Sequence, residues 1–236
     1  ASDVYKRQEI IDLINFLKKL GCKIKRVGKR GFNILGVKEL KSAVHKVIFD
    51  RIEAGTYIIA AALTKGYLKI KNIDSKIMST EINLLQKMGV NIIKKKNYLI
   101  VGRSKKLKSV NIITEPYPGF PTDLQAQIMV LMIKAKGKSK IKENIFENRF
   151  MHVPELNRMG AKIKILGNSS TIIGPQSLNG AEVMATDLRA SVSLVLAGLI
   201  AKDKTTINRV YHLDRGYEGL EKKLRKCKAN ISRIHY

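Results

Sequence analysis

The chain has 236 residues, of which 44% are hydrophobic, so it can build one large domain or two small ones around a core. Its two cysteines, Cys22 and Cys227, exclude a disulfide framework, and the sequence shows no metal-ligand cluster, no apolar membrane span and no secretory signal. We therefore expect a cytoplasmic protein that needs neither a metal ion nor an organic cofactor and does not bind membranes.

The net charge is +26, from 45 lysine and arginine residues against 19 acidic residues. Such a charge can indicate nucleic-acid binding. Here, however, most of the charge is lysine scattered along the chain, and aromatic residues, which stack on bases, make up only 6%. We therefore do not expect nucleic acid as the main partner, because attraction of small anionic substrates explains the charge equally well.

An internal repeat organises the chain from residue 9 onward, whereas residues 1–8 lack its pattern and are interpreted as a linker or remnant. Segments that are predicted to end a helix and start a strand recur roughly seventy residues apart, at residues 18–24, 86–92, 157–163 and 225–231. Gly21, Gly89 and Gly160 occupy the position at which a left-handed residue closes a helix. Lys228 takes that position in the last segment.

A second series of segments alternates with the first. Each segment begins with an acidic residue, continues as an apolar helix and turns into a short strand, and the segments are residues 53–70, 123–141 and 187–207. Strands and two helices therefore form a unit that is repeated about a common core. This organisation predicts an α/β fold.

A lysine-poor stretch, residues 113–127, combines three prolines and a glycine with Asp123. Proline fixes the backbone angle φ and lacks an amide donor, which predicts an ordered loop over residues 115–121. Thr122 or Asp123 can then cap a helix that runs through Leu131. Asp123 thus has two possible roles: a helix N-cap, or a general base held by a stiff loop.

Three arginines, Arg149, Arg189 and Arg215, lie in segments nearly free of lysine and do not recur at equivalent places in every unit. Because a guanidinium group matches both carboxylate and phosphate, the three can together bind an anionic substrate. His152 and His212 are interpreted as structural histidines. In the alternative interpretation, each arginine pairs with its acidic neighbour, which is Glu147, Asp187 or Asp214.

Five motifs follow one another along the chain: residues 50–56 (DRIEAGT), 117–127 (YPGFPTDLQAQ), 145–156 (IFENRFMHVPEL), 184–190 (MATDLRA) and 212–217 (HLDRGY). Together they resemble the UDP-N-acetylglucosamine 1-carboxyvinyltransferases of the enolpyruvyl transferase family. The likeness extends from Glu9 to Ile234 and covers the C-terminal portion of the family's sequence only.

The resemblance implies transfer of enolpyruvate from phosphoenolpyruvate to the 3′-hydroxyl of UDP-N-acetylglucosamine with release of phosphate. This reaction is the first committed step of peptidoglycan precursor synthesis. The resemblance also implies two similar domains, each an inside-out α/β barrel of three repeated units, with the active site between them. On this basis, residues 9–48 are the last part of a truncated first domain, and residues 49–236 form the second domain.

The resemblance also implies roles for single residues. Asp123 takes the proton of the sugar hydroxyl, and Arg189 and Arg215 hold phosphoenolpyruvate, with Arg149 beside them. Asp123, Arg189 and Arg215 are therefore the expected catalytic residues. The other expected substrate contacts are Ile145, Phe146, Asp187 and Leu188.

The family's N-terminal half has no match in this sequence. That half carries a lysine–asparagine pair and a mobile loop with a proton-donating cysteine or aspartate, and neither Cys22 nor Cys227 matches the loop position. We therefore expect the chain alone to be inactive, to expose apolar surface over residues 9–48 and to need the missing half as its partner. An alternative is a non-catalytic, basic binding protein derived from the same fold.

Overall fold

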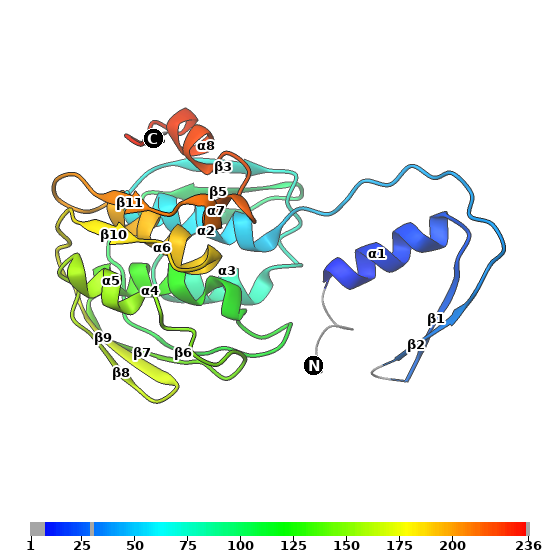
Figure 1. Ribbon diagram of the computed structural model, residues 1–236, viewed down its shortest axis with the longest axis horizontal. Helices are drawn as coiled ribbons and strands as arrows, with labels where there is room; N and C mark the ends of the chain where they lie inside the picture. Colours follow the sequence, from blue (N-terminus) through cyan, green and yellow to red (C-terminus); the bar gives the residue numbers. More distant parts are fainter. Residues whose placement is uncertain (1–7, 29–30, 235–236) are drawn as a thin grey trace.

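Three apolar helices form the centre of the molecule, and small β-sheets surround them (Figure 1). The computed structural model describes residues 8–28 and 31–234. Each central helix is followed by a strand, which confirms the predicted α/β fold of repeated units. The central helices are α2 (Arg51–Leu63), α4 (Gln125–Lys134) and α6 (Leu188–Gly198).

The central helices are buried because they are apolar around almost their whole circumference. Every residue of α4 from Gln125 to Ile133 is buried, as is every residue of α6 from Ala190 to Ala197. Helix α4 contacts both α2 and α6. Helices therefore lie inside and strands outside, which is the order that the family resemblance implies.

The strands form separate sheets and no closed barrel within the described residues. One antiparallel sheet has the order β3 (Leu68–Lys71), β5 (Tyr98–Gly102) and β4 (Asn91–Lys94). A second has the order β6 (Asn111–Ile113), β7 (Gly137–Lys142), β9 (Ser169–Gly174) and β8 (Ile163–Leu166). A third contains β10 (Glu182–Met184) and β11 (Thr206–Asn208), which run parallel.

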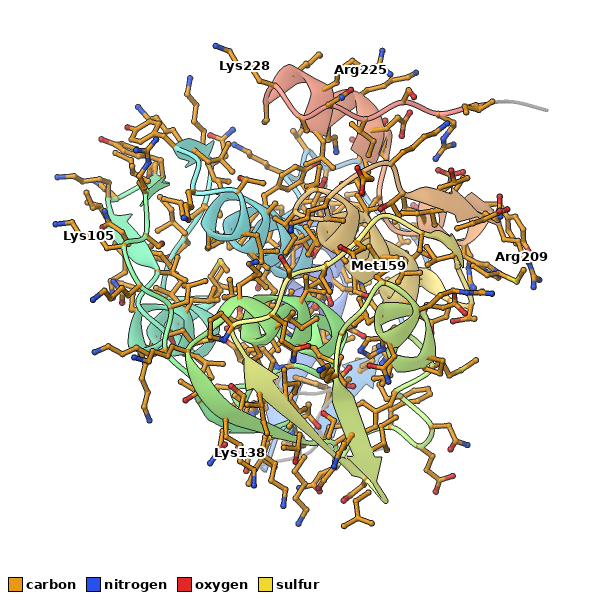
Figure 2. All side chains as sticks on the ribbon, turned by 90° about the vertical axis from the view of Figure 1, so that its left-hand side faces the viewer. Lys105, Lys138, Met159, Arg209, Arg225 and Lys228 are labelled. Atoms are coloured by element: carbon orange, nitrogen blue, oxygen red, sulfur yellow. The ribbon has the colours of Figure 1, made fainter. Side chains whose placement is uncertain are left out.

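The outer sheets turn one face to the helices and the other to solvent. In β7, Ser139 and Ile141 are fully buried and alternate with the exposed Lys138, Lys140 and Lys142. Figure 2 shows basic side chains, Lys138 among them, projecting outward around the ribbon. The positive charge is therefore spread over the surface and is not gathered on one helix.

The outer helices end in the same way in each repeat. Gly89 and Gly160 have φ angles of 93°, and the amides of these residues and their successors donate back to the last helical turn. Lys228 has a φ of 68° and makes the same hydrogen bonds, so the predicted left-handed helix ends are confirmed. The helices concerned are α3 (Ser79–Lys87), α5 (Val153–Arg158) and α8 (Leu220–Lys226).

Strands follow α3 and α5 as predicted, but no strand follows α8 within the described residues. Strands β4 and β8 are each hydrogen-bonded to an antiparallel neighbour, β5 and β9 respectively. Residues 229–234 have no such neighbour in the described part of the chain. The predicted strand at residues 229–231 is therefore wrong here, because a strand forms only where a partner satisfies its backbone groups.

An N-terminal arm stands beside the body of the molecule (Figure 1). Val44 and Val47 are 93% and 72% exposed, and α1 contains no buried residue, which confirms the predicted exposed apolar surface. The arm meets the body where Gln8 Nε2 donates to the Tyr117 hydroxyl at 3.0 Å. The arm comprises α1 (Gln8–Lys19), β1 (Lys23–Val27), β2 (Gly31–Leu35) and the extended residues 36–50.

The sequence predicts domain limits at residues 8/9 and 48/49. Residues 1–7 of the predicted linker lie outside the described residues, and Gln8 is the first residue of α1. The division between residues 9–48 and residues 49–236 remains a prediction.

Candidate active site

The loop before Asp123 is ordered, as predicted. Residues 115–121 form neither a helix nor a strand, and Gly119 N donates to Pro116 O at 2.7 Å to close the turn. A Cβ atom on Gly119 would lie 2.4 Å from Cβ of Glu115, so only glycine fits there. The loop leads into the 3₁₀ turn η2 (Thr122–Leu124) and then into α4.

Neither Thr122 nor Asp123 caps α4, so the predicted N-cap role is wrong for both residues. Leu124 is the N-cap residue, and it has no side-chain oxygen. Thr122 Oγ1 instead donates to Oε2 of the buried Glu143 at 2.9 Å. Asp123 lies within the 3₁₀ turn that precedes α4, and the carboxylate of Asp123 interacts with other side chains.

The Asp123 carboxylate bridges two arginines from different segments. Its Oδ1 lies 2.8 Å from Nη2 of Arg149, and its Oδ2 lies 3.1 Å from Nη2 of Arg189. The arginine side chains are 16% and 18% exposed, respectively, and that of Asp123 is 37% exposed. Burial, the largest single influence, opposes the charge of Arg189, but Asp123 and Tyr217 together outweigh it and raise the pKa of Arg189. The cluster is therefore a charged, half-buried site whose carboxylate a ligand can reach.

Arg149 projects from the loop that follows β7, and a buried carboxylate shapes this loop. Glu143 is 3% exposed, and its Oε1 accepts hydrogen bonds from the backbone amides of Ile145 and Phe146 at 2.9 and 3.1 Å. Because Glu143 also accepts the Thr122 hydroxyl, it joins this loop to the turn before α4. The exposed Phe146 ring has its centroid 5.0 Å from the Arg149 guanidinium carbon.

Arg189 projects from the first turn of α6, and Asp187 caps that helix. Oδ1 of Asp187 accepts hydrogen bonds from the backbone amides of Arg189 and Ala190 at 2.7 and 2.9 Å. The cap fixes the start of α6, and the Arg189 side chain extends from it to Asp123.

The alternative in which each arginine pairs with its acidic neighbour is wrong. Arg149 and Arg189 both pair with Asp123. Asp214 pairs at 2.6 Å with Arg233, a residue of the segment after α8. Partners distant in sequence therefore replace the local ones.

Tyr217 connects the site to the central helices. It is 1% exposed, and its hydroxyl lies 2.9 Å from Thr56 Oγ1 on α2 and 3.4 Å from Nε2 of Gln127 on α4. It also interacts with the Arg189 guanidinium, which favours the charged form of the arginine and raises the pKa of Arg189. Gln127 Nε2 donates in addition to the backbone carbonyl of Asp123 at 2.9 Å. Burial raises the pKa of Tyr217, so its hydroxyl stays protonated at neutral pH. Through Gln127, the tyrosine is linked to the backbone of Asp123.

Arg215, the third expected arginine, follows the short helix α7 (Tyr211–Asp214) and is exposed. The next residue, Gly216, lies against Leu188, because a Cβ atom on it would be 2.7 Å from Leu188 Cδ2. Arg215 therefore directly precedes a residue that lies against the start of α6, the helix from which Arg189 projects. The rings of His212 and Tyr211 pack with centroids 4.3 Å apart.

His152 is buried among the residues of this region and is 2% exposed. Burial lowers the pKa of His152 to about 4. The charge of Asp187 acts to raise this pKa, and the charge of Arg149 lowers it further. Nε2 has no hydrogen-bond partner among the described residues. The burial of His152 agrees with the structural role interpreted from the sequence, but that role remains a prediction, and one of the ring nitrogens is unsatisfied.

Four residues that organise the site received no role from the sequence. Thr56 and Gln127 carried one signal that could have revealed them, because each is a polar residue in a largely apolar helix. Glu143 and Tyr217 carried no comparable local signal, since the groups they bind are distant in sequence.

Over residues 8–28 and 31–234, no group of histidine, cysteine, aspartate and glutamate could hold a metal ion. No helix in the same ranges is long and apolar enough to cross a membrane.

The structure is similar to that of the enolpyruvyl transferase NikO from Streptomyces tendae. The TM-score is 0.89 at 30% sequence identity, and the match covers 98% of this chain and 55% of that protein. An EPSP synthase from Acinetobacter baumannii gives a TM-score of 0.71 over 93% of this chain and 55% of that one. Its identity of 17% supports the fold alone. The fold is therefore that of the enolpyruvyl transferases.

Proteins similar in sequence specify which enolpyruvyl transferases the chain resembles. Residues 2–224 match the family described as EPSP synthase (3-phosphoshikimate 1-carboxyvinyltransferase), and the chain belongs to this family. The UDP-N-acetylglucosamine 1-carboxyvinyltransferases of Pelagibacter ubique and Geotalea daltonii are 63% and 55% identical to it over 96% of the chain. These matches cover 54% of each relative, so the chain spans about half the length of the curated relatives it matches. The family resemblance is confirmed, including its restriction to part of the family's sequence.

Proposed function

We propose that the chain supplies one wall of the active site of a UDP-N-acetylglucosamine 1-carboxyvinyltransferase. The reaction transfers enolpyruvate from phosphoenolpyruvate to the 3′-hydroxyl of UDP-N-acetylglucosamine and releases phosphate. The observation that carries the proposal is the Asp123 carboxylate held between Arg149 and Arg189. The 63% identity to the Pelagibacter ubique relative favours UDP-N-acetylglucosamine as the acceptor over 3-phosphoshikimate, the compound in the family's description.

Asp123 is the proposed general base. As the acceptor oxygen bonds to the central carbon of phosphoenolpyruvate, its proton passes to Asp123, and the bond from that carbon to the phosphate oxygen breaks. A base must lie within hydrogen-bond reach of the proton it removes. The two arginine contacts and the 37% exposure of the Asp123 side chain meet that need, because they fix a carboxylate that remains accessible.

The arginines are the proposed sites for the anionic groups. Phosphoenolpyruvate carries a carboxylate and a phosphate, and we assign these to Arg189 and Arg215, with Arg149 beside them. The exposed Phe146 next to Arg149 offers an apolar surface to the sugar nucleotide. The remaining proposed substrate contacts are Ile145, Asp187 and Leu188.

One wall cannot place a proton donor and a base on both sides of two substrates. We therefore propose that this chain alone has little or no turnover. Its proposed partner is the part of the longer protein that corresponds to the unmatched portion of its relatives. The proposed setting is peptidoglycan precursor synthesis in the cytoplasm.

The test joins this chain to the portion of the Pelagibacter ubique relative that it does not match. Phosphate release from phosphoenolpyruvate is then measured with UDP-N-acetylglucosamine or 3-phosphoshikimate as the acceptor. The expected result is release with UDP-N-acetylglucosamine by the joined protein and almost none by the chain alone. Release with 3-phosphoshikimate only would contradict the proposed acceptor. A folded joined protein that is inactive with both acceptors would favour a non-catalytic basic binding protein.

A further inference from the structure

Glu143 stands at a position that the other two repeats use differently. The residue directly after the strand that follows the central helix is Asn72 after β3, Glu143 after β7 and Arg209 after β11. Asn72 and Arg209 are exposed, and each has a left-handed φ of 59°. Glu143 is 3% exposed and is not among the residues with positive φ. A carboxylate is therefore buried at this position only in the repeat that carries Asp123.

The Glu143 carboxylate accepts hydrogen bonds from donors in three segments. Besides the amides of Ile145 and Phe146, its Oε1 accepts the hydroxyl of Thr114 at 2.7 Å. Its Oε2 accepts the hydroxyl of Thr122. A carboxylate offers about four lone-pair directions, so these donors use its whole accepting capacity. The carboxylate is therefore held in one orientation, and it holds its donors in place in turn.

Parallel strands bring Thr114 next to Glu143. Strands β6 and β7 run parallel with Ile113 opposite Lys142, so the residues that follow the two strands lie side by side. Thr114 is fully buried, and its amide donates to the Lys142 carbonyl at 2.9 Å. Its Oγ1 also accepts the Asn144 amide at 2.9 Å. Thr114 therefore supports the Oε1 side of the carboxylate at the start of the loop after β7.

The two carboxylate oxygens serve two parts of the candidate site. Oε1 fixes the backbone of Ile145 and Phe146, which are proposed contacts of the sugar nucleotide and are called the acceptor loop below. Oε2 fixes Thr122, which directly precedes the proposed base Asp123. A general base works only within hydrogen-bond reach of its proton, and a misplacement of about 1 Å lowers a rate about 100-fold. One side chain therefore sets the acceptor loop and the base relative to each other.

We infer that Glu143 is a positioning residue of the proposed reaction, which holds the acceptor loop at a fixed distance from Asp123. The inference rests on the proposed function. Glu143 acts through its hydrogen-bond partners and not on a substrate. Loss of the Oε1 side weakens the binding of UDP-N-acetylglucosamine, whereas loss of the Oε2 side slows proton removal. The two sides therefore predict different kinetic defects.

Thr122 tests the Oε2 side in the joined protein, with kcat and the KM for UDP-N-acetylglucosamine measured separately. Thr122→Val removes the hydroxyl that binds Oε2 but keeps the shape of the side chain. The expected result is a fall in kcat of about tenfold, with a KM that changes less than about twofold. Thr122→Ser, which keeps the hydroxyl, is the matched control and is expected to restore most of the kcat.

Thr114 tests the Oε1 side in the same assay. Thr114→Val removes a donor to Oε1 and the acceptor of the Asn144 amide. The expected result is the reverse of that for Thr122→Val: the KM for UDP-N-acetylglucosamine rises about tenfold, and kcat changes less than about twofold. Thr114→Ser is the matched control.

Glu143→Leu removes both sides at once and is expected to show both defects. Adding Thr122→Val to it is expected to lower kcat no further, because the link from Thr122 to Oε2 is already absent. The threonine variants decide the question if Glu143→Leu does not fold.

Hydrogen exchange in the chain alone gives a measurement that does not require turnover. The amides of residues 144–146 are expected to exchange about tenfold faster in Thr114→Val than in Thr122→Val, because Thr114 supports the Oε1 side that holds them.

Two results would overturn the inference. If both valine variants changed KM and kcat alike, or lowered only the Tm, Glu143 would be structural, while turnover by the unsubstituted joined protein would still uphold the proposed function. If the unsubstituted joined protein folded but did not use UDP-N-acetylglucosamine, the proposed function would fail and the inference with it. Faster exchange in Thr114→Val would then report a role of Glu143 in the fold alone.

Discussion

Asp123 and Asp187 occupy the same place in two repeats, but only Asp187 caps the helix that follows it. Both residues stand in a Thr-Asp-Leu sequence before a central helix. Asp187 accepts hydrogen bonds from two backbone amides of α6, whereas Asp123 lies within the 3₁₀ turn that precedes α4 and pairs with Arg149 and Arg189. The fold therefore uses one carboxylate for its scaffold, and the equivalent carboxylate lies in the candidate site.

Replacing Tyr217 with phenylalanine is expected to weaken both the fold and the site. The change removes the buried hydroxyl that interacts with Thr56, Gln127 and Arg189. We expect a loss of about 1–2 kcal/mol in the free energy of unfolding, measured with denaturant. In the joined protein, kcat/KM is expected to fall roughly tenfold, because Arg189 is held less firmly. Tyr211→Phe is the matched control, since Tyr211 is exposed and its hydroxyl accepts hydrogen bonds from the Arg209 guanidinium at the surface. Equal effects of the two variants would contradict the account.

His152 is expected to make stability depend on pH. Its pKa is about 4 in the folded chain and about 6.5 when unfolded, so between these values only the unfolded chain takes up the proton. The contribution of neutral His152 to the free energy of unfolding is therefore complete above pH 6.5. It is lost as the pH falls toward 4. From pH 7.5 to pH 5 the expected loss from this group is about 2 kcal/mol.

The His152 prediction is checked by comparing denaturant unfolding of the chain with that of His152→Gln at both pH values. Carboxyl groups titrate in both proteins, so the difference between their pH dependences isolates the histidine. Identical pH dependence in the two proteins would show that His152 titrates normally in the folded state.

Replacing Lys228 with glycine is expected to stabilise the chain by about 1 kcal/mol. Lys228 has a φ of 68°, in the region that a Cβ atom disfavours, while its backbone makes the same cap hydrogen bonds as Gly89 and Gly160. The control is Lys226→Gly at the last residue of α8, where the backbone is helical and glycine should therefore destabilise the chain. The measurement is thermal unfolding of both variants. Shifts of Tm in the same direction for the two variants would refute this explanation.

The N-terminal arm is expected to make the isolated chain associate. Val44 and Val47 are among its most exposed apolar residues. Replacing both with asparagine should reduce light scattering and the binding of a hydrophobic dye. Leu166→Asn is the control, because Leu166 is also exposed but lies in a different part of the molecule, on β8. A monodisperse monomer that does not bind the dye would contradict this prediction.

Much of the fold could be predicted because its signals are local. Glycine after a helix marks the ends at Gly21, Gly89 and Gly160, and long apolar stretches mark the central helices. The strand predicted after Lys228 failed because strand formation depends on a neighbour that local sequence does not reveal.

The candidate site could be predicted as a set of residues but not as a geometry. Asp123 looked like a cap because aspartate before an apolar helix usually is one. Its actual partners, Arg149 and Arg189, are brought to it by the packing of α4, α6 and the loop after β7. Local sequence favoured nearer partners for both arginines, so only the folded chain reveals the pairing.

The most direct measurement of the central claim is kcat for Asp123→Asn in the joined protein, with UDP-N-acetylglucosamine as the acceptor. The variant keeps the shape of the side chain but removes the carboxylate that accepts the hydroxyl proton. Asp74→Asn is the control, because Asp74 is exposed and its carboxylate accepts a hydrogen bond from the nearby Lys76 backbone amide. The account predicts a fall in kcat of about 10²–10⁴-fold for Asp123→Asn, with unchanged folding and a normal control. A folded Asp123→Asn variant that turns over as fast as the control would contradict it.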